Sequence, residues 1–328
     1  KRRQRQQQFL ELRMTMIESS TRCPTPLILS IANALAYTLN SLETFGYGPF
    51  SHAFFSNQDN ASISQKYQTI ITPHGIAFSI WALIFLGEAA CVFVAVVCSE
   101  RCRTHPLMVE GVSYWFVAVC LAQTAWSPAF ADESMLLSTV FMTCILLALI
   151  MIVTRQYNVV TKVLDMESTT NTTLIPSSYY WLLQFPFELH LGWIIAAFAL
   201  NVNILVIAWG GNATIQQIVA VASLIGLAVV SYACIWTFER PQYTVPCVAS
   251  WATFWMSFEL RNPKQLITET FSDQTIHSFF LCTISLSGII ASVTVIRWIY
   301  YHCDVSKRKT YSTVDNSANG GSYLQSDG

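Results

Sequence analysis

The stretch ITPHGIAFSIWALIFLGEA, residues 71–89, decides the fold class of this chain. After its opening Pro and His it stays apolar for about four helical turns, as a helix inside a lipid bilayer must. It also contains one indole, Trp81, and one carboxylate, Glu88. An ionisable side chain inside the bilayer costs about 2.5–3.5 kcal/mol on insertion scales, so it needs a partner or a cavity. The stretch therefore predicts a transmembrane helix and makes Glu88 a candidate for function.

The composition of the whole chain agrees with this stretch. Of its 328 residues, 53% are hydrophobic and 11% are charged, whereas a soluble domain has about 25% charged residues. The predicted partner is therefore the lipid bilayer, in which the chain is an integral membrane protein. The net charge is −1 and the basic residues lie in loops and tails, so no nucleic-acid partner is predicted.

The hydropathy pattern predicts an all-α, polytopic membrane helix bundle with about eight transmembrane helices. The expected spans are residues 26–44, 74–98, 111–131, 134–154, 181–209, 215–238, 243–260 and 274–301. Asn33 and Asn40 weaken the first span, and the seventh is short and interrupted by polar residues. Residues 26–301 are thus expected to form the bundle. They lie between a basic tail, residues 1–25, and a polar, disordered cytoplasmic tail, residues 302–328.

The distribution of basic residues predicts the orientation of the bundle, because lysine and arginine collect in cytoplasmic loops. With eight spans and the N-terminus inside, 15 of the 18 basic residues fall on the cytoplasmic side. The other three, Lys66, Arg261 and Lys264, fall outside. This asymmetry predicts a multi-pass protein with both termini cytoplasmic and disfavours a seven-span alternative. The distribution of basic residues predicts the orientation of the chain but does not indicate which cellular membrane contains it.

Helical spacing places five residues of the second span on one face: His74, Phe78, Trp81, Phe85 and Glu88. This face is aromatic and has a polar group at each end, which is typical of the wall of a ligand pocket. In the alternative interpretation, Trp81 and Phe85 pack between helices and Glu88 hydrogen-bonds a neighbouring helix.

The third and fifth spans carry further aromatic and polar residues of interest, namely Trp126 with Gln123 beside it in the third and His190, Trp193 and Asn201 in the fifth. The three residues of the fifth span share a face that we expect to point into a cavity. Glu188 lies two residues before His190 and points to nearly the opposite side, so the two do not form a catalytic pair. As a metal or haem ligand His190 would stand alone, and the default interpretation is a hydrogen-bonded helix residue.

No catalytic or metal site is predicted. The sequence contains no His cluster, no nucleophile–base arrangement, no nucleotide loop and no metal box. We therefore expect a protein that is not an enzyme, has no catalytic residues or metal ligands, and requires no cofactor.

Three motifs together resemble the TspO/MBR family, the tryptophan-rich sensory and translocator proteins. The second span carries Thr-Pro-x-Gly-x-x-Phe-Ser-Ile-Trp, from Thr72 to Trp81. The third carries Gln-x-x-Trp-Ser-Pro, from Gln123 to Pro128, and the fifth carries Pro-Phe-x-x-x-x-Gly-Trp, from Pro186 to Trp193. The chain looks most similar to longer relatives in this family, which have additional spans after a five-helix core.

This resemblance implies a TspO-like five-helix core and an aromatic pocket that binds porphyrins or sterols. It implies that Trp81, Trp126 and Trp193 line the pocket and that Gln123 and Asn201 contribute polar contacts. Gln123 stands where the family usually has Asn. Because TspO-like proteins are often dimers, the resemblance also suggests a homodimer as a candidate assembly.

The leading interpretation is a membrane protein that binds a flat hydrophobic ligand, a tetrapyrrole or a sterol, in an aromatic intramembrane cavity. The binding would serve sensing or translocation. The alternative is a proton-coupled small-molecule transporter in which Glu88 titrates, with Glu188 and His190 near the proton path. A scaffold or assembly role is a third interpretation.

Overall fold

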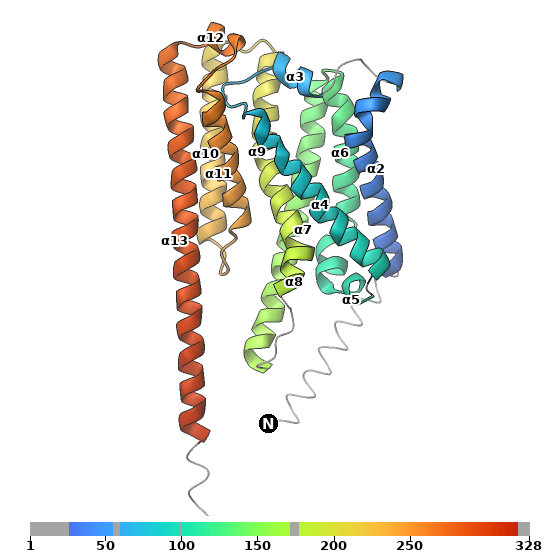
Figure 1. Ribbon diagram of the computed structural model, residues 1–328, viewed down its shortest axis with the longest axis vertical. Coiled ribbons are helices and arrows are strands. Elements are labelled where there is room, and N and C mark those ends of the chain that lie inside the picture. Colours follow the sequence, from blue (N-terminus) through green and yellow to red (C-terminus); the bar gives the residue numbers. More distant parts are fainter. Residues whose placement is uncertain (1–25, 55–59, 99, 171–176, 321–328) are drawn as a thin grey trace, which may run out of the picture.

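The computed structural model describes residues 26–54, 60–98, 100–170 and 177–320 as a bundle of long helices (Figure 1). The described part of the chain contains no β-strand. The long helices are α2 (Pro26–Phe54), α4 (Ile80–Phe93), α6 (Trp115–Ala131), α7 (Met135–Thr170), α9 (Phe185–Ala208), α10 (Ala213–Trp236), α11 (Thr244–Glu259) and α13 (Asp273–Gly320). Each of the eight predicted spans thus coincides with one long helix, and the predicted all-α class is confirmed.

Shorter elements join these helices or extend them. Four are short α-helices, namely α3 (Asn60–Lys66), α5 (Glu100–Arg103), α8 (Ser177–Tyr179) and α12 (Gln265–Thr270). A 3₁₀ turn, η1 (Gly75–Ser79), leads into α4. Three wider π-type turns are η2 (Val94–Cys98), η3 (Leu107–Val112) and η4 (Tyr180–Gln184). With η1 and η2 included, the second span becomes long enough to cross a bilayer.

Five helical segments of the described chain are long and apolar enough to cross a membrane, by length and composition. They are Gly75–Val97, Met135–Val163, Tyr180–Ala208, Ala213–Trp236 and Asp273–Cys303. The chain is therefore an integral membrane protein. Helices α2, α6 and α11 complete the same bundle, α6 as a shorter apolar helix (Figure 1).

Polar residues of the first and seventh predicted spans make contacts with other segments of the bundle. In α2, Asn33 donates to the carbonyl oxygen of Ser113 at 3.2 Å, and Tyr37 donates to that of Phe85 at 2.8 Å. In α11, the hydroxyl of Ser250 lies 3.0 Å from the carbonyl oxygen of Ser287 in α13. Inside a bilayer such groups are stabilised by partners on neighbouring helices rather than by water.

Helix α9 lies at the centre of the bundle. It packs against α4 and α7 on one side and against α10 and α11 on the other. Its close approach to α11 depends on Gly192, where a Cβ atom would lie 2.9 Å from the Cβ of Val248. One hydrophobic core lies among α2, α4, α6, α7 and α9, and a second lies where α9 meets the C-terminal helices. The chain thus has a five-helix core to which α10, α11 and α13 are added.

Successive long helices run in opposite directions, so the two ends of the described bundle, Pro26 and the end of α13, lie toward the same end of the molecule (Figure 1). This agrees with an even number of crossings. Helix α13 continues to Gly320, well past the expected end of the last span at residue 301. The predicted basic tail, residues 1–25, lies outside the described residues.

Candidate functional site

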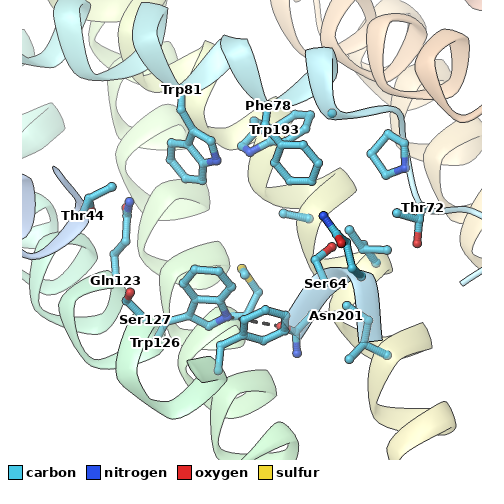
Figure 2. Close-up of a pocket in the computed structure, with 18 of the residues that line it drawn as sticks. Thr44, Ser64, Thr72, Phe78, Trp81, Gln123, Trp126, Ser127, Trp193 and Asn201 are labelled. Carbon is cyan, nitrogen blue, oxygen red and sulfur yellow. Dashed lines mark hydrogen bonds between the residues drawn. The ribbon is translucent and has the colours of Figure 1, made fainter. Parts of the chain in front are cut away.

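A cavity of about 440 Å³ is lined in part by Ser64 and Gln65 of α3 and by Lys264, which precedes α12 (Figure 2). Helices α3 and α12 lie at the same end of the bundle (Figure 1). Three indoles from three helices line the cavity: Trp81 of α4, Trp126 of α6 and Trp193 of α9. Phe78, Gln123 and Asn201 line it as well. Six of the ten sequence-predicted site residues therefore meet at one cavity, although the first and last of them, Phe78 and Asn201, lie 123 positions apart in the chain. Its size is within the range of about 300–1,000 Å³ that is usual for small-molecule sites.

Asn201 holds one wall of this cavity in place. Its side-chain oxygen accepts hydrogen bonds from the indole N–H of Trp126 at 3.2 Å and from the hydroxyl of Ser138 at 2.9 Å. Its amide nitrogen donates to the hydroxyl of Thr139 at 2.7 Å. The ring of Trp126 also stacks on Phe130, with ring centres 5.2 Å apart. Asn201 is thus a residue that orients Trp126, and its polar atoms already have protein partners.

The opposite wall is formed by aromatic rings in edge-to-face contact, the arrangement that ring quadrupoles favour. The ring centre of Trp193 lies 5.4 Å from that of Phe78 and 6.3 Å from that of Trp81. Two buried polar atoms of the lining residues, Nε1 of Trp193 and Oε1 of Gln123, have no hydrogen-bond partner among the described residues. Figure 2 shows the side chain of Gln123 extending toward Trp81. Buried polar groups are nearly always paired, so these two atoms indicate where a ligand or water is expected to bond.

Comparison with known proteins gives the family. A family model described as TSPO-like protein matches residues 27–295. This chain belongs to the TSPO-like protein family. No curated protein and no solved structure matches the chain. The resemblance drawn from the three motifs is therefore confirmed, and the match extends past the five-helix core into α13 of this TSPO-like protein.

Glu88 lies beside the cavity of the TSPO-like chain but does not line it. Its carboxylate lies 2.7 Å from Nδ1 of His190, and both side chains are only 1% exposed. Gly87 permits this pairing, because a Cβ there would lie 3.0 Å from the ring of Pro186 on α9. The ring of His190 meets the ring of Trp81 at 74°, with centres 5.5 Å apart. Trp81 thus contacts the buried pair and also lines the cavity.

His74 and Phe85 also lie away from the cavity lining. His74 precedes η1, where its Nδ1 accepts from the backbone N–H of Ile76, and its ring stacks on Trp255 of α11. Phe85 packs against Tyr37 and Trp81 in the interior. The expected single ligand-binding face, from His74 to Glu88, is therefore divided. A uniform helical repeat does not hold here, since the helix begins after His74 with a tighter 3₁₀ turn. The cavity also ends at Trp81, before Phe85 and Glu88 are reached.

Glu188 belongs to a different polar cluster on the other side of α9. Its carboxylate accepts hydrogen bonds from Thr244 at 2.7 Å, Gln184 at 3.0 Å and Tyr180 at 3.2 Å. This cluster adjoins a second cavity of about 700 Å³, between α9 and the C-terminal helices. Glu188 and His190 therefore lie apart, as their spacing of two residues predicted.

Residues outside the predicted spans complete the mouth of the first cavity. Thr72 and Pro73 precede η1, and Ser64 and Gln65 lie in α3. Nearby, the ammonium of Lys66 pairs with the carboxylate of Glu133 at 2.6 Å. Hydrogen bonds from this ammonium and from the hydroxyl of Tyr67 lower the pKa of Glu133. Lys264, from the loop before α12, reaches the same cavity. Span-by-span reasoning overlooked these residues because they lie outside the apolar runs.

Proposed function

We propose that this TSPO-like protein binds a flat hydrophobic small molecule, of the tetrapyrrole or sterol class, in the tryptophan cavity. The observation that carries the proposal is the convergence of Trp81, Trp126 and Trp193 on one cavity of about 440 Å³. Indole faces offer large, rigid apolar surfaces for a planar ligand, and a few polar groups fix its orientation. Because these indoles come from different helices, bound ligand would change helix packing, which is the basis we propose for sensing or translocation.

The proposal includes neither an enzymatic reaction nor a resident cofactor. Among the described residues, no group of three or more His, Cys, Asp or Glu side chains is placed to hold a metal ion. We propose the ligand as cargo or signal. The unpaired Nε1 of Trp193 and Oε1 of Gln123 are the atoms that we expect to bond its polar groups.

The test is a binding titration of the purified full chain with protoporphyrin IX, haem and cholesterol. Binding is followed through the ligand's own absorbance or radiolabel, so that replacing a tryptophan does not alter the signal. We expect saturable binding of at least one ligand, weakened roughly tenfold by Trp81→Leu because a lost aromatic contact costs about 0.5–1.5 kcal/mol beyond its area. Trp209→Leu is the matched control, since Trp209 is 67% exposed at the end of α9 and lies outside the cavity. No saturable binding, or equal losses in both variants, would overturn the proposal.

Proton-coupled transport is the second candidate, and the buried Glu88–His190 pair is the observation that favours it. An ionisable pair in contact with Trp81 offers a means by which proton binding changes the shape of the cavity wall. Glu88 would then be the titrating group, with His190 as its partner. The test measures small-molecule uptake driven by a pH gradient in two sets of vesicles, one containing the parent chain and one containing Glu88→Gln. Uptake that does not depend on pH in the parent would remove this candidate.

A further inference from the structure

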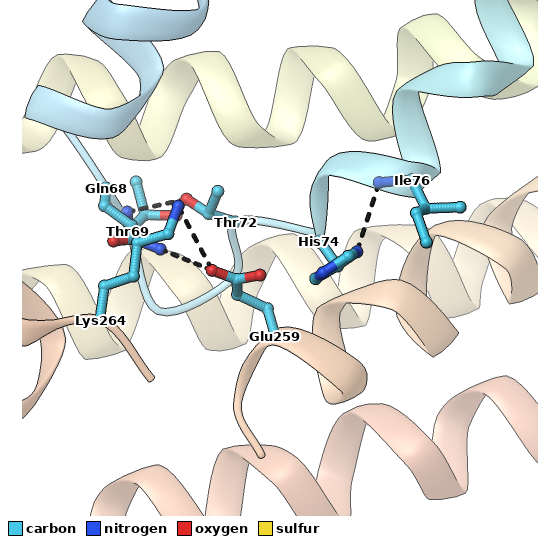
Figure 3. Close-up of polar contacts among 7 residues, drawn as sticks. All are labelled: Gln68, Thr69, Thr72, His74, Ile76, Glu259 and Lys264. Atoms are coloured by element: carbon cyan, nitrogen blue, oxygen red, sulfur yellow. Dashed lines mark hydrogen bonds and ion pairs between the residues drawn. The ribbon is translucent and has the colours of Figure 1, made fainter. Parts of the chain in front are cut away.

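Lys264 contributes a positive charge to a cavity that is otherwise uncharged. It lies between α11 and α12, outside the five-helix core, and its side chain extends toward the segment from Gln68 to Thr72 (Figure 3). The other described lining residues are aromatic, aliphatic, hydroxyl or amide residues. The other charged pair near this mouth, Lys66 and Glu133, is joined at 2.6 Å. Lys264 is thus the charged group that a molecule inside the cavity would meet.

The ammonium of Lys264 is only loosely held by the protein. Its nearest carboxylate oxygen, Oε1 of Glu259, lies 3.5 Å away, beyond the usual length of about 2.7–3.2 Å for an N–H···O hydrogen bond. The same oxygen already accepts a hydrogen bond from the side chain of Gln68 at 3.1 Å (Figure 3). The side chain of Lys264 is 51% exposed, and an ammonium carries three donors. Donors therefore remain for a group that arrives from the cavity.

We propose that Lys264 anchors an anionic group, a carboxylate, of the ligand whose apolar body rests against the three tryptophans. The proposal rests on the function proposed above and narrows the ligand class to planar hydrophobic acids. Such a molecule would place its apolar rings among Trp81, Trp126 and Trp193 and its acid group at the mouth, where water keeps the cost of the charge low. A neutral sterol would leave Lys264 unused.

Glu259, the carboxylate nearest to Lys264, gives a second way to test this proposal. It competes with an incoming carboxylate for Lys264, and it also accepts the hydrogen bond from Gln68. Glu259→Gln removes the competing charge but keeps an oxygen acceptor for Gln68. An anchoring lysine should therefore bind a ligand acid more tightly in this variant. A lysine that serves only as a surface ion pair with Glu259 would give no such gain.

The experiment measures the affinity of the full chain for protoporphyrin IX, which has two carboxylates, and for its dimethyl ester, which has none. The variants are Lys264→Gln, Glu259→Gln and the charge-matched control Lys66→Gln. We expect Lys264→Gln to weaken diacid binding roughly three- to tenfold, between the effects of an exposed ion pair and a shielded, charge-assisted hydrogen bond. Glu259→Gln should tighten diacid binding, and Lys66→Gln should leave it unchanged. Ester binding should be the same in all four proteins, and 1 M salt should shrink the diacid differences.

The two probes separate failure of this proposal from failure of the proposed function. The first measure is the ratio of diacid affinity to ester affinity. If this ratio is the same in the parent and in Lys264→Gln, the cavity binds planar ligands but Lys264 is not an anchor. An equal loss of diacid affinity in Lys264→Gln and Lys66→Gln would also overturn the anchor, because it would reflect general surface charge. If neither probe binds the parent in a saturable way, both proposals are lost.

Discussion

At the scale of single residues, two buried ionisable groups of this protein are paired across helices. Glu88 of α4 and His190 of α9 lie 2.7 Å apart, although 102 positions separate them in the chain. The sequence predicts that Glu88 needs a partner, because an unpaired charge in the bilayer is costly. It does not predict which residue is the partner, since that depends on how two distant helices are rotated against each other.

Removing one member of this pair should cost more stability than removing both. Glu88→Leu or His190→Leu alone leaves a buried polar group without its partner, so each should lower the free energy of unfolding by about 3–5 kcal/mol. The double variant should be more stable than the sum of the two losses implies. Thermal unfolding in one detergent measures the four proteins of this double-mutant cycle: the parent, the two single variants and the double variant. Simple additivity would mean that the two side chains do not interact.

His105, between α5 and η3, gives a prediction about pH. Burial lowers its pKa to about 4, below the usual value near 6.5, and its ring lies 4.6 Å from that of Tyr179. Between these two values the unfolded chain binds more protons than the folded one, so stability rises with pH. The parent should therefore lose stability as the pH falls from about 6.5 to 4, and His105→Gln should lose less. A melting series over this range checks the difference, and parallel curves would contradict it.

Among single residues, the sequence predicted much of the cavity lining. Phe78, Trp81, Gln123, Trp126, Trp193 and Asn201 were predicted, and they line one cavity. Whether they bind a ligand stays a prediction. His74 was misplaced because helical spacing was extended past the start of the helix. Lys264 was not predicted as a cavity residue, since a lysine in a loop carries no local sign of the cavity that it reaches.

At the scale of elements, the positions of the helices were more predictable than their ends. All eight apolar runs became long helices, including the short seventh, whose Ser250 bonds to Ser287 of α13. Helix α7, expected over residues 134–154, continues to Thr170, because a helix does not stop where its apolar pattern stops. The π-type turns η2, η3 and η4 were not predicted, since hydropathy does not report hydrogen-bond register.

The contact between α9 and α11 should be sensitive to a single methyl group at Gly192. A Cβ there would lie 2.9 Å from the Cβ of Val248 and 3.3 Å from the Cα of Val245, so α11 must move. Gly192→Ala should cost about 1–3 kcal/mol, the usual price of overpacking a core. Gly288→Ala in α13 is the matched control, because nothing lies within 4 Å of its Cβ position. A melting comparison tests this, and equal effects of the two substitutions would argue against tight packing at Gly192.

At the scale of the whole molecule, the bundle and the charge pattern together predict which end faces the cytoplasm. The loop between α10 and α11 and the loop between α11 and α12 lie at opposite ends (Figure 1). Since basic residues concentrate on the side of the first of these loops, we expect that side to be cytoplasmic. Which end is cytoplasmic remains a prediction.

Cysteine labelling tests this orientation. Glu239→Cys, before α11, and Asn262→Cys, after it, should react with a membrane-impermeant maleimide from opposite sides of sealed vesicles. Glu239→Cys should react from the cytoplasmic side. The parent chain gives the background from its own exposed cysteines, among them Cys144, Cys282 and Cys303. Labelling of both positions from one side would rule out α11 as a crossing helix, and the reverse pattern would invert the orientation.

The central place of α9 bears on how this protein is made. Glu188 and His190 point to opposite sides of α9, yet both are buried, because the helix has protein on each side. Thr244, which bonds Glu188, is synthesised 56 residues after it. Before α11 is made, the partners of this carboxylate among the described residues are Tyr180 and Gln184 of η4, the turn that precedes α9. The five-helix core therefore leaves one flank of α9 to be covered by the C-terminal helices, and Glu188 gains the hydrogen bond from Thr244 only when α11 is in place.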